Sequence, residues 1–410
     1  MPGNCIMMQE RLQRAEAADM SGLEKRTVLL NTLFNFGAVL VSLFISVYLY
    51  VYTKSIPIMC LQVICRIAMF PLFFSLAYKM SLKCRLGVTY TIGLVLITLS
   101  LVYTLVIGER FAIHPYLVVG QAMIYGTGEG FFWYSTNTSN QIIPTRESRN
   151  LFLSRNGIFS NTAAILAPVF STVILSLTET ETEGYRVILY SITAVFALVS
   201  CVAFSIGKRT EDREDCLKES FLLAGKDERI RKFYLSYIIY GLVSGMSLGL
   251  INLMIFRAVG SGNTYSRLQI LFSLTTVSGF YVIRYLFAWG RVSMTFKVGA
   301  AIRVAAIAVL ALVPNTAGAV IHGILYAASN VFFDNCVSFI SGFLIDDYPR
   351  QKSALVVTRE VMLSIGRITS MLLVLLFYRL LPGEAYLVVT PILLSLAAIW
   401  TERLLLSCRK

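Results

Sequence analysis

The stretch that decides the fold is EGFFWYSTN at residues 129–137, which is followed after a short loop by SRNGIFSNTAAILAPVFS at residues 154–171. A related pair of blocks recurs later, as SNVFFDNCV at residues 329–337 and TREVMLSIGRITSMLLVL at residues 358–375. In each pair, a block with two phenylalanines and one acid precedes a block that begins with a hydroxyl residue and an arginine. The similarity predicts an internal repeat of two helical halves, and chance similarity between apolar helices is the alternative.

The composition around these blocks points to a membrane. Of 410 residues, 56% are hydrophobic and 14% are charged, whereas soluble domains carry about 25% charged residues. The apolar residues fall in blocks of about 20, the length that a helix needs to cross the hydrocarbon core. We therefore predict an all-α polytopic membrane protein with twelve transmembrane helices, at residues 27–53, 56–79, 86–107, 111–135, 150–177, 186–206, 233–256, 267–288, 294–313, 316–343, 353–379 and 384–401.

A mixed-charge stretch between the sixth and seventh predicted spans is too polar to enter lipid. It separates two pseudo-symmetric six-helix bundles. The expected parts are an N-terminal cytoplasmic segment, a first bundle, a cytoplasmic central loop and a second bundle, at residues 1–26, 27–206, 207–232 and 233–410.

The basic residues indicate topology rather than nucleic-acid binding. The net charge is +13, but Lys and Arg fall in short clusters between apolar blocks instead of forming one basic domain. With an even number of spans, the positive-inside rule places both termini in the cytoplasm. Residues 1–26 lack an apolar stretch with a cleavage site, so we expect no signal peptide.

Twelve spans, a charged central loop and a repeat of two six-span halves resemble the major facilitator superfamily along nearly the whole chain. The chain looks closest to poorly characterised bacterial members. This resemblance implies two six-helix bundles that alternate access to a substrate site between them. It also implies a monomeric, multi-pass protein of the bacterial cytoplasmic membrane.

Two motifs depart from the family pattern. The loop AYKMSLKCRLG at residues 77–87 keeps basic residues but lacks the Asp of the family signature, which leaves the conformational latch of that motif in doubt. In span five, other small residues stand where the family's exporters carry spaced glycines, and they favour export only weakly. These small residues, together with one proline, are Ser154, Ala163, Ala167, Pro168 and Ser171.

Two arginines fall near mid-depth of their predicted spans, Arg66 in span two and Arg367 in span eleven. A charge inside a span is costly and usually faces a cavity or a partner. Because a guanidinium can hold a carboxylate or phosphate with two hydrogen bonds, we predict that both arginines bind an anionic part of the substrate. The alternative is that each pairs with an acid or with helix carbonyls and serves packing alone.

The repeated blocks also carry two sets of an acid and a base. We expect Glu129 to pair with Arg155 and Asp334 with Arg359, on the cytoplasmic side of the spans. Exchange of a proton for such a partner is one way to couple transport to a proton gradient, and a purely structural ion pair is the alternative. Span nine is expected to be a lipid-facing support, with Arg303 toward its cytoplasmic end.

Three polar side chains are further candidates for substrate binding: Asn35 in span one, Asn161 in span five and Tyr237 in span seven. Tyr237 belongs to a stripe of tyrosines at helical spacing, and such a stripe packs more often than it binds. The two histidines and eight cysteines form no zinc-binding cluster, so we expect no cofactor and no metal.

These features together predict a secondary active transporter rather than an enzyme. The expected partners are a small amphiphilic or anionic solute, protons and membrane lipids, with no nucleic acid, and export is slightly favoured. A lipid or glycolipid flippase of the same fold is the first alternative. A membrane-embedded enzyme or a non-transporting sensor is the alternative from another class.

Overall fold

The computed structural model describes residues 20–145, 148–208, 215–288 and 291–408. These residues form helices joined by short turns and loops, without strands. Most of the expected segment 1–26 and residues 209–214 of the central loop lie outside the described ranges. The helices are α2 Gly22–Thr53, α3 Ile56–Ser81, α4 Leu86–Ile107, α5 Arg110–Ile113, α6 Leu117–Ile142, α7 Arg149–Leu177, α8 Glu181–Phe204, α9 Leu217–Lys226, α10 Glu228–Ser247, α11 Leu250–Val259, α12 Gly262–Ala288, α13 Val292–Leu312, α14 Thr316–Ser329, α15 Asn335–Asp346, α16 Lys352–Leu380, α17 Tyr386–Ser395 and α18 Ala397–Cys408.

The long helices correspond to the predicted apolar blocks. Ten helical segments in the described ranges are long and apolar enough to cross a membrane. The long helices α6 and α12 lie alongside them, at the places of the fourth and eighth predicted spans. The all-helical, multi-pass architecture is confirmed, and the count of twelve crossings stays a prediction.

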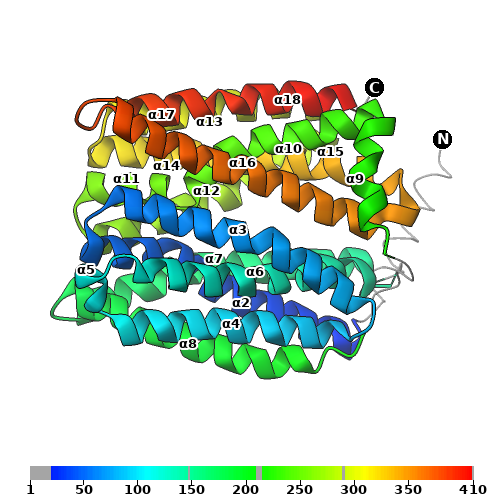
Figure 1. The fold of residues 1–410 in the computed structure, drawn as a ribbon, viewed down its shortest axis with the longest axis horizontal. Coiled ribbons are helices and arrows are strands. Elements are labelled where there is room, and N and C mark those ends of the chain that lie inside the picture. The colour runs from blue at the N-terminus through cyan, green and yellow to red at the C-terminus, as the bar shows by residue number, and fades with distance from the viewer. Residues whose placement is uncertain (1–19, 146–147, 209–214, 289–290, 409–410) are drawn as a thin grey trace.

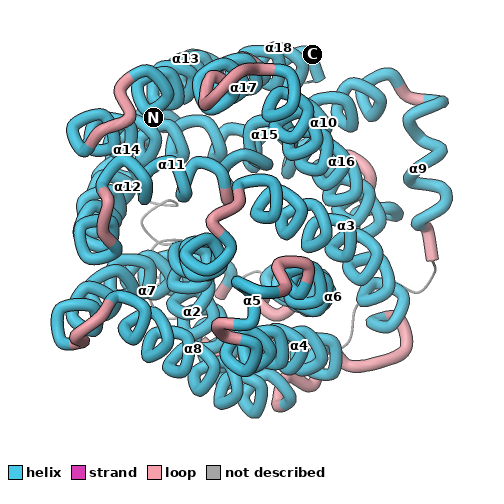
Figure 2. Tube along the Cα trace, turned by 60° about the vertical axis from the view of Figure 1, so that its left-hand side comes forward, coloured by secondary structure: helices cyan, strands magenta, loops and turns pink. Residues whose placement is uncertain are grey.

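The helices form two bundles, α2 to α8 and α10 to α18, with α9 between them in the chain (Figure 1). The start of α2 and the end of α18 lie at one end of the molecule, which we call the termini end. We call the other end, with α5 and the α11–α12 turn, the loop end. Between the bundles, α3 packs against α16 and α7 against α12 (Figure 2).

Glycines set the close packing of α6 in the first bundle. A Cβ atom at Gly126 would lie 2.1 Å from the Arg66 carbonyl oxygen on α3, and one at Gly130 would lie 2.7 Å from the Phe70 carbonyl oxygen. Only glycine permits backbones to approach so closely. The glycines therefore hold α6 against α3, which brings Arg66 and Glu129 to the same depth.

Hydrogen bonds join the two bundles directly from mid-depth to the loop end. The Asn252 amide donates to the Ser42 carbonyl (3.2 Å), and the Gly262 amide donates to the Glu181 carboxylate (2.9 Å). Further bonds join α7 to α12, from Ser171 to Ser266, from Asn263 to Ser176 and from Ser273 to the Ala164 carbonyl. We call this set the loop-end seam.

Two helix irregularities lie at the centre of the second bundle. The helix is interrupted between α10 and α11 at Leu248 and Gly249, where Gly249 has φ −162° and ψ −52°. A π-helical turn at Asn330–Asp334 joins α14 to α15. Such turns often occur at functional sites, because the local bulge re-aims side chains.

Polar contacts at the termini end hold α9 and the start of α10 to the second bundle. The Ser220 hydroxyl of α9 bonds with Thr358 (2.6 Å), and Arg229 pairs with Asp347 (2.9 Å). Asp227 caps α10 and accepts a hydrogen bond from the Tyr348 hydroxyl, and that bond holds the pKa of Asp227 below its ordinary value.

Candidate functional site

Two cavities meet between the bundles. The first-half cavity, of about 380 Å³, is lined mainly by α2, α3, α6 and α16. The second-half cavity, of about 410 Å³, is lined mainly by α10, α11, α12 and α14. Ser42, Leu248 and Arg367 line both cavities, so the two spaces adjoin at the helix break in the second bundle.

A buried ion pair forms one wall of the first-half cavity. Arg66 Nε and Nη2 donate to the two carboxylate oxygens of Glu129, at 2.6 and 2.7 Å. The Arg66 guanidinium also lies 4.7 Å from the centre of the Tyr125 ring. Arg66 and Glu129 are each only 9% exposed, so each charge depends on the other to replace the water that burial removes.

A second ion pair, in the second-half cavity, involves a residue that the sequence analysis placed elsewhere. Arg303 of α13 donates to both carboxylate oxygens of Asp334, at 2.9 and 3.0 Å, and to the Asn330 side chain at 2.6 Å. The Tyr240 hydroxyl donates to Asp334 at 3.0 Å. Because Asn330 and Asp334 belong to the π-helical turn, that turn directs both side chains toward Arg303.

These pairs correct two expected pairings. Glu129 pairs with Arg66, so the expected pairing with Arg155 is wrong, and Arg155 is exposed. Asp334 pairs with Arg303, while Arg359 pairs with its chain neighbour Glu360 at 2.6 Å. Helix rotation and the order of neighbouring helices decide these partners, and sequence spacing specifies neither.

Arg303 also contradicts its expected place toward the end of a lipid-facing helix. It is 1% exposed and lines the second-half cavity. Its mid-helix position, 11 residues after the start of α13, is the signal that could have identified it.

Arg367 differs from the other arginines that line the cavities. Its Nε donates to the Ser244 hydroxyl at 3.2 Å, and no carboxylate of the described residues lies within ion-pair distance. It is half-buried at the junction of the two cavities. Its guanidinium therefore has donors available for a ligand that enters either space.

His322 supplies a neutral hydrogen-bond acceptor to the second-half cavity. Its Nδ1 lies 2.7 Å from the Ala306 carbonyl oxygen, and a carbonyl can only accept, so Nδ1 carries the proton. In the neutral imidazole Nε2 is then an acceptor, and it is buried without a hydrogen-bond partner among the described residues. The ring stacks on Tyr326, at a centroid distance of 5.2 Å. The sequence analysis assigned His322 no role.

The remaining predicted residues lie outside the cavity linings. Asn35 donates to the Ser160 carbonyl at 2.7 Å, which ties α2 to α7. Tyr237 is buried with its ring 5.7 Å from the Arg359 guanidinium, and Asn161 is half-buried on α7. Arg66, Arg367, Glu129, Asp334 and Arg359 all line a cavity. The roles predicted for all these residues stay predictions.

Comparison with known proteins supports the fold. No family model matches the chain. The uncharacterized protein YqgE of Bacillus subtilis (strain 168) is 23% identical over 358 residues, which cover 86% of this chain and 82% of that protein.

Solved structures of transporters superpose on the chain. The nucleoside transporter NupG matches with a TM-score of 0.70 and 12% identity, over 95% of this chain and all of NupG. The human organic anion transporter MFSD10 matches with a TM-score of 0.64 and 15% identity, over 93% of this chain and 99% of that protein. The chain therefore shares the fold of these transporter structures, in line with the resemblance that the sequence showed.

Proposed function

We propose that this chain is a secondary active transporter, in which the two bundles alternate access to a small solute held in the two adjoining cavities. The observation that carries the proposal is Arg367, a cation that lines both cavities and forms no ion pair with a described residue. A site between two bundles near mid-depth is the usual arrangement in transporters of this plan.

The substrate that fits these cavities carries an anionic group and a hydrogen-bond donor. Arg367 offers donors to a carboxylate or phosphate, and His322 Nε2 offers an acceptor to a hydroxyl or amine. Phe272 and Tyr326 add aromatic surface to the second-half cavity. A small amphiphilic anion meets all of these requirements.

Proton coupling is assigned to the two carboxylates that pair across helices, Glu129 and Asp334. Protonation of either acid removes the charge that holds its arginine, Arg66 or Arg303. The freed guanidinium is then available to bind the anionic solute, so binding of a proton favours binding of the solute. Arg66, Glu129 and Arg367 all line the first-half cavity, so a solute held there by Arg367 lies beside the pair that takes up the proton.

Because proton and anionic solute bind together in this linkage, an inward proton gradient would drive uptake, and the export that the sequence slightly favours is supported by the small residues of α7 alone. Ala163 and Ala167 are buried, and the Ser171 hydroxyl lies 3.3 Å from Ser266 of α12. Small residues at such a contact let α7 and α12 slide or separate with little rearrangement of side chains. The bacterial cytoplasmic membrane with both termini inside is the proposed setting.

The proposal is tested with purified protein in liposomes that contain the pH-sensitive dye pyranine. Matched pairs of solutes, such as uridine and uridine monophosphate, are added outside, and internal pH and solute uptake are recorded. A transporter of this type moves the anionic member and changes the dye signal. If no solute moves while labelled lipids cross the bilayer faster than in empty liposomes, the chain is a flippase and the proposal fails.

Coupling is tested with Glu129→Gln and Asp334→Asn, which retain hydrogen-bonding capacity but not charge. We expect both variants to exchange solute without a gradient but to lose at least part of the stimulation by an imposed pH gradient. Thermal unfolding in detergent confirms that each variant is folded. Equal gradient dependence in wild type and both variants would exclude a coupling role for these carboxylates.

A further inference from the structure

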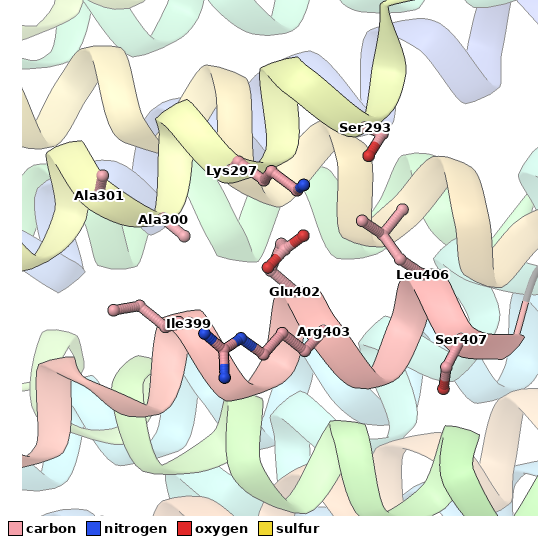
Figure 3. Close-up of a pocket in the computed structure, with 9 residues that line it drawn as sticks. All are labelled: Ser293, Lys297, Ala300, Ala301, Ile399, Glu402, Arg403, Leu406 and Ser407. Atoms are coloured by element: carbon pink, nitrogen blue, oxygen red, sulfur yellow. The ribbon is translucent and has the colours of Figure 1, made fainter.

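A third space lies away from the two central cavities, on the outer side of the second bundle. It is a groove of about 920 Å³ between α13 and α18. Figure 3 shows Lys297 of α13 and Glu402 of α18 reaching toward each other across it, with Arg403 beside Glu402. Ser293 and Ser407 line the end of the groove that lies nearest the helix ends. No residue of the groove lines either central cavity.

The charged residues lie near the ends of their helices, a position that suits lipid headgroups. Lys297 is five residues after the start of α13, and Arg403 is five residues before the end of α18. At about 1.5 Å per residue, each lies roughly 7.5 Å from its helix end. Trp400 is 59% exposed, and its ring is 5.9 Å from the Arg403 guanidinium. Exposed tryptophans beside basic residues are typical of the membrane interface.

The rest of the groove suits acyl chains. Ala300, Ala301, Ile399 and Leu406 line it without charge. Next to it, Met294 is 58% exposed and so available to lipid. A ligand of the groove therefore has a polar head beside the charged residues and an apolar body.

Glu402 is the residue that determines which polar headgroup the groove would accept. It is 5% exposed, and it forms no ion pair within 4.0 Å and no hydrogen bond with the described residues. The charges that act on it belong to Lys297 and Arg403. A buried carboxylate requires a close donor or cation, because desolvation is otherwise costly. Two cations and one such carboxylate match a headgroup that carries both a phosphate and an amine.

We propose that this groove binds a phospholipid whose headgroup carries a phosphate and a primary ammonium. The phosphate lies between Lys297 and Arg403, with the serine hydroxyls as further donors, and the ammonium donates to Glu402. The acyl chains follow the alanine surface of α13. A trimethylated ammonium fits less well, since it has no hydrogen to donate.

The test compares phosphatidylethanolamine with phosphatidylcholine of identical acyl chains, bound to the delipidated full chain and counted by native mass spectrometry. We expect the ethanolamine lipid to bind about tenfold more tightly, which corresponds to about 1.4 kcal/mol. Glu402→Gln should abolish this preference. Lys297→Gln combined with Arg403→Gln should weaken both lipids. Lys83→Gln, which removes another cation outside the groove, should change neither.

Three results would overturn the proposal. One is equal binding of the two lipids to the wild-type chain, and another is a preference that survives Glu402→Gln. The third is tighter binding of phosphatidylglycerol than of phosphatidylethanolamine, which would indicate a site for anionic lipids in general. Soluble phosphoethanolamine should bind far more weakly than the lipid. Equal binding of the two would show that the acyl chains do not contribute, and the groove would then not be a phospholipid site.

Discussion

The substitution Arg367→Gln should weaken anion binding with little effect on folding, which makes it the most informative change among the residues that line the cavities. The substitution removes the charge and keeps a side chain that can bond with Ser244. A neutral hydrogen bond contributes about 0.5–1.5 kcal/mol to stability, so loss of the bond to Ser244 should destabilise the folded chain by no more than this amount. Because no acid of the described residues pairs with Arg367, no buried carboxylate is left behind. The variant should fold with nearly unchanged thermal stability.

The effect on anion binding should be much larger. A hydrogen bond to a charged group is worth about 1.5–3 kcal/mol. At about 1.4 kcal/mol per factor of ten, the dissociation constant of an anionic ligand should rise by about 10- to 100-fold. The neutral member of a matched pair should be affected little.

Ligand-dependent thermal unfolding of the purified protein measures this difference, with uridine against uridine monophosphate and glucose against glucose 6-phosphate as probes. Arg66→Gln is the matched control, because Arg66 lines the first-half cavity but is neutralised by Glu129. Breaking a buried pair costs about 3–5 kcal/mol, so this control should lose stability. The reasoning is refuted if Arg367→Gln retains wild-type affinity for every anion that the wild-type chain binds.

Four further predictions concern other parts of the molecule. Arg303→Met should lower the free energy of unfolding by about 3–5 kcal/mol, because Asp334 loses its partner, and denaturation in detergent would measure it. Gly126→Ala should destabilise by about 1–3 kcal/mol, since its Cβ would clash with the α3 backbone, whereas a change below 0.5 kcal/mol would contradict that packing. His322→Phe should leave folding intact but weaken ligands that carry a donor, and equal losses for ligands without a donor would argue against Nε2 as the acceptor. Because the pKa of Asp227 is lowered in the folded chain, its contact with Tyr348 stabilises fully above the unfolded-state pKa of about 3.9, and this stability is lost as pH falls through the lower pKa of the folded chain. Thermal unfolding of Asp227→Asn should therefore differ from wild type at pH 7, and the difference should shrink as pH falls below about 3.9.

Much of the fold could be predicted because lipid restricts what a sequence can do. Apolar blocks of sufficient length must become helices, so the helix positions followed from the sequence alone. The helix ends were less accurate, as in the last span, where α18 continues to Cys408 beyond the predicted end at residue 401. Polar residues near a membrane surface do not end a helix, and the hydropathy pattern therefore does not mark its end.

The site was predicted only in part. The depth of Arg66 and Arg367 is a property of spacing along one helix, and both line the central cavities as expected for such a depth. The partners of Glu129 and Asp334 depend on how neighbouring helices are rotated, which a single sequence does not specify. The π-helical turn shifts the facing of Asn330 and Asp334, and a regular helical wheel does not account for that shift.

The loop-end seam has a consequence for the proposed coupling. Most of its hydrogen bonds join neutral groups, such as Ser171 with Ser266 and Asn263 with Ser176. At about 0.5–1.5 kcal/mol each, the five bonds of the seam contribute only about 2.5–7.5 kcal/mol to holding the loop end closed. In the proposed transporter, thermal motion alone would then open the loop end, and solute would equilibrate across the membrane without an energy source. Under that proposal, the direction of net flow would depend on whether the buried carboxylates carry protons and the arginines hold solute when the seam opens, and not on the strength of the seam.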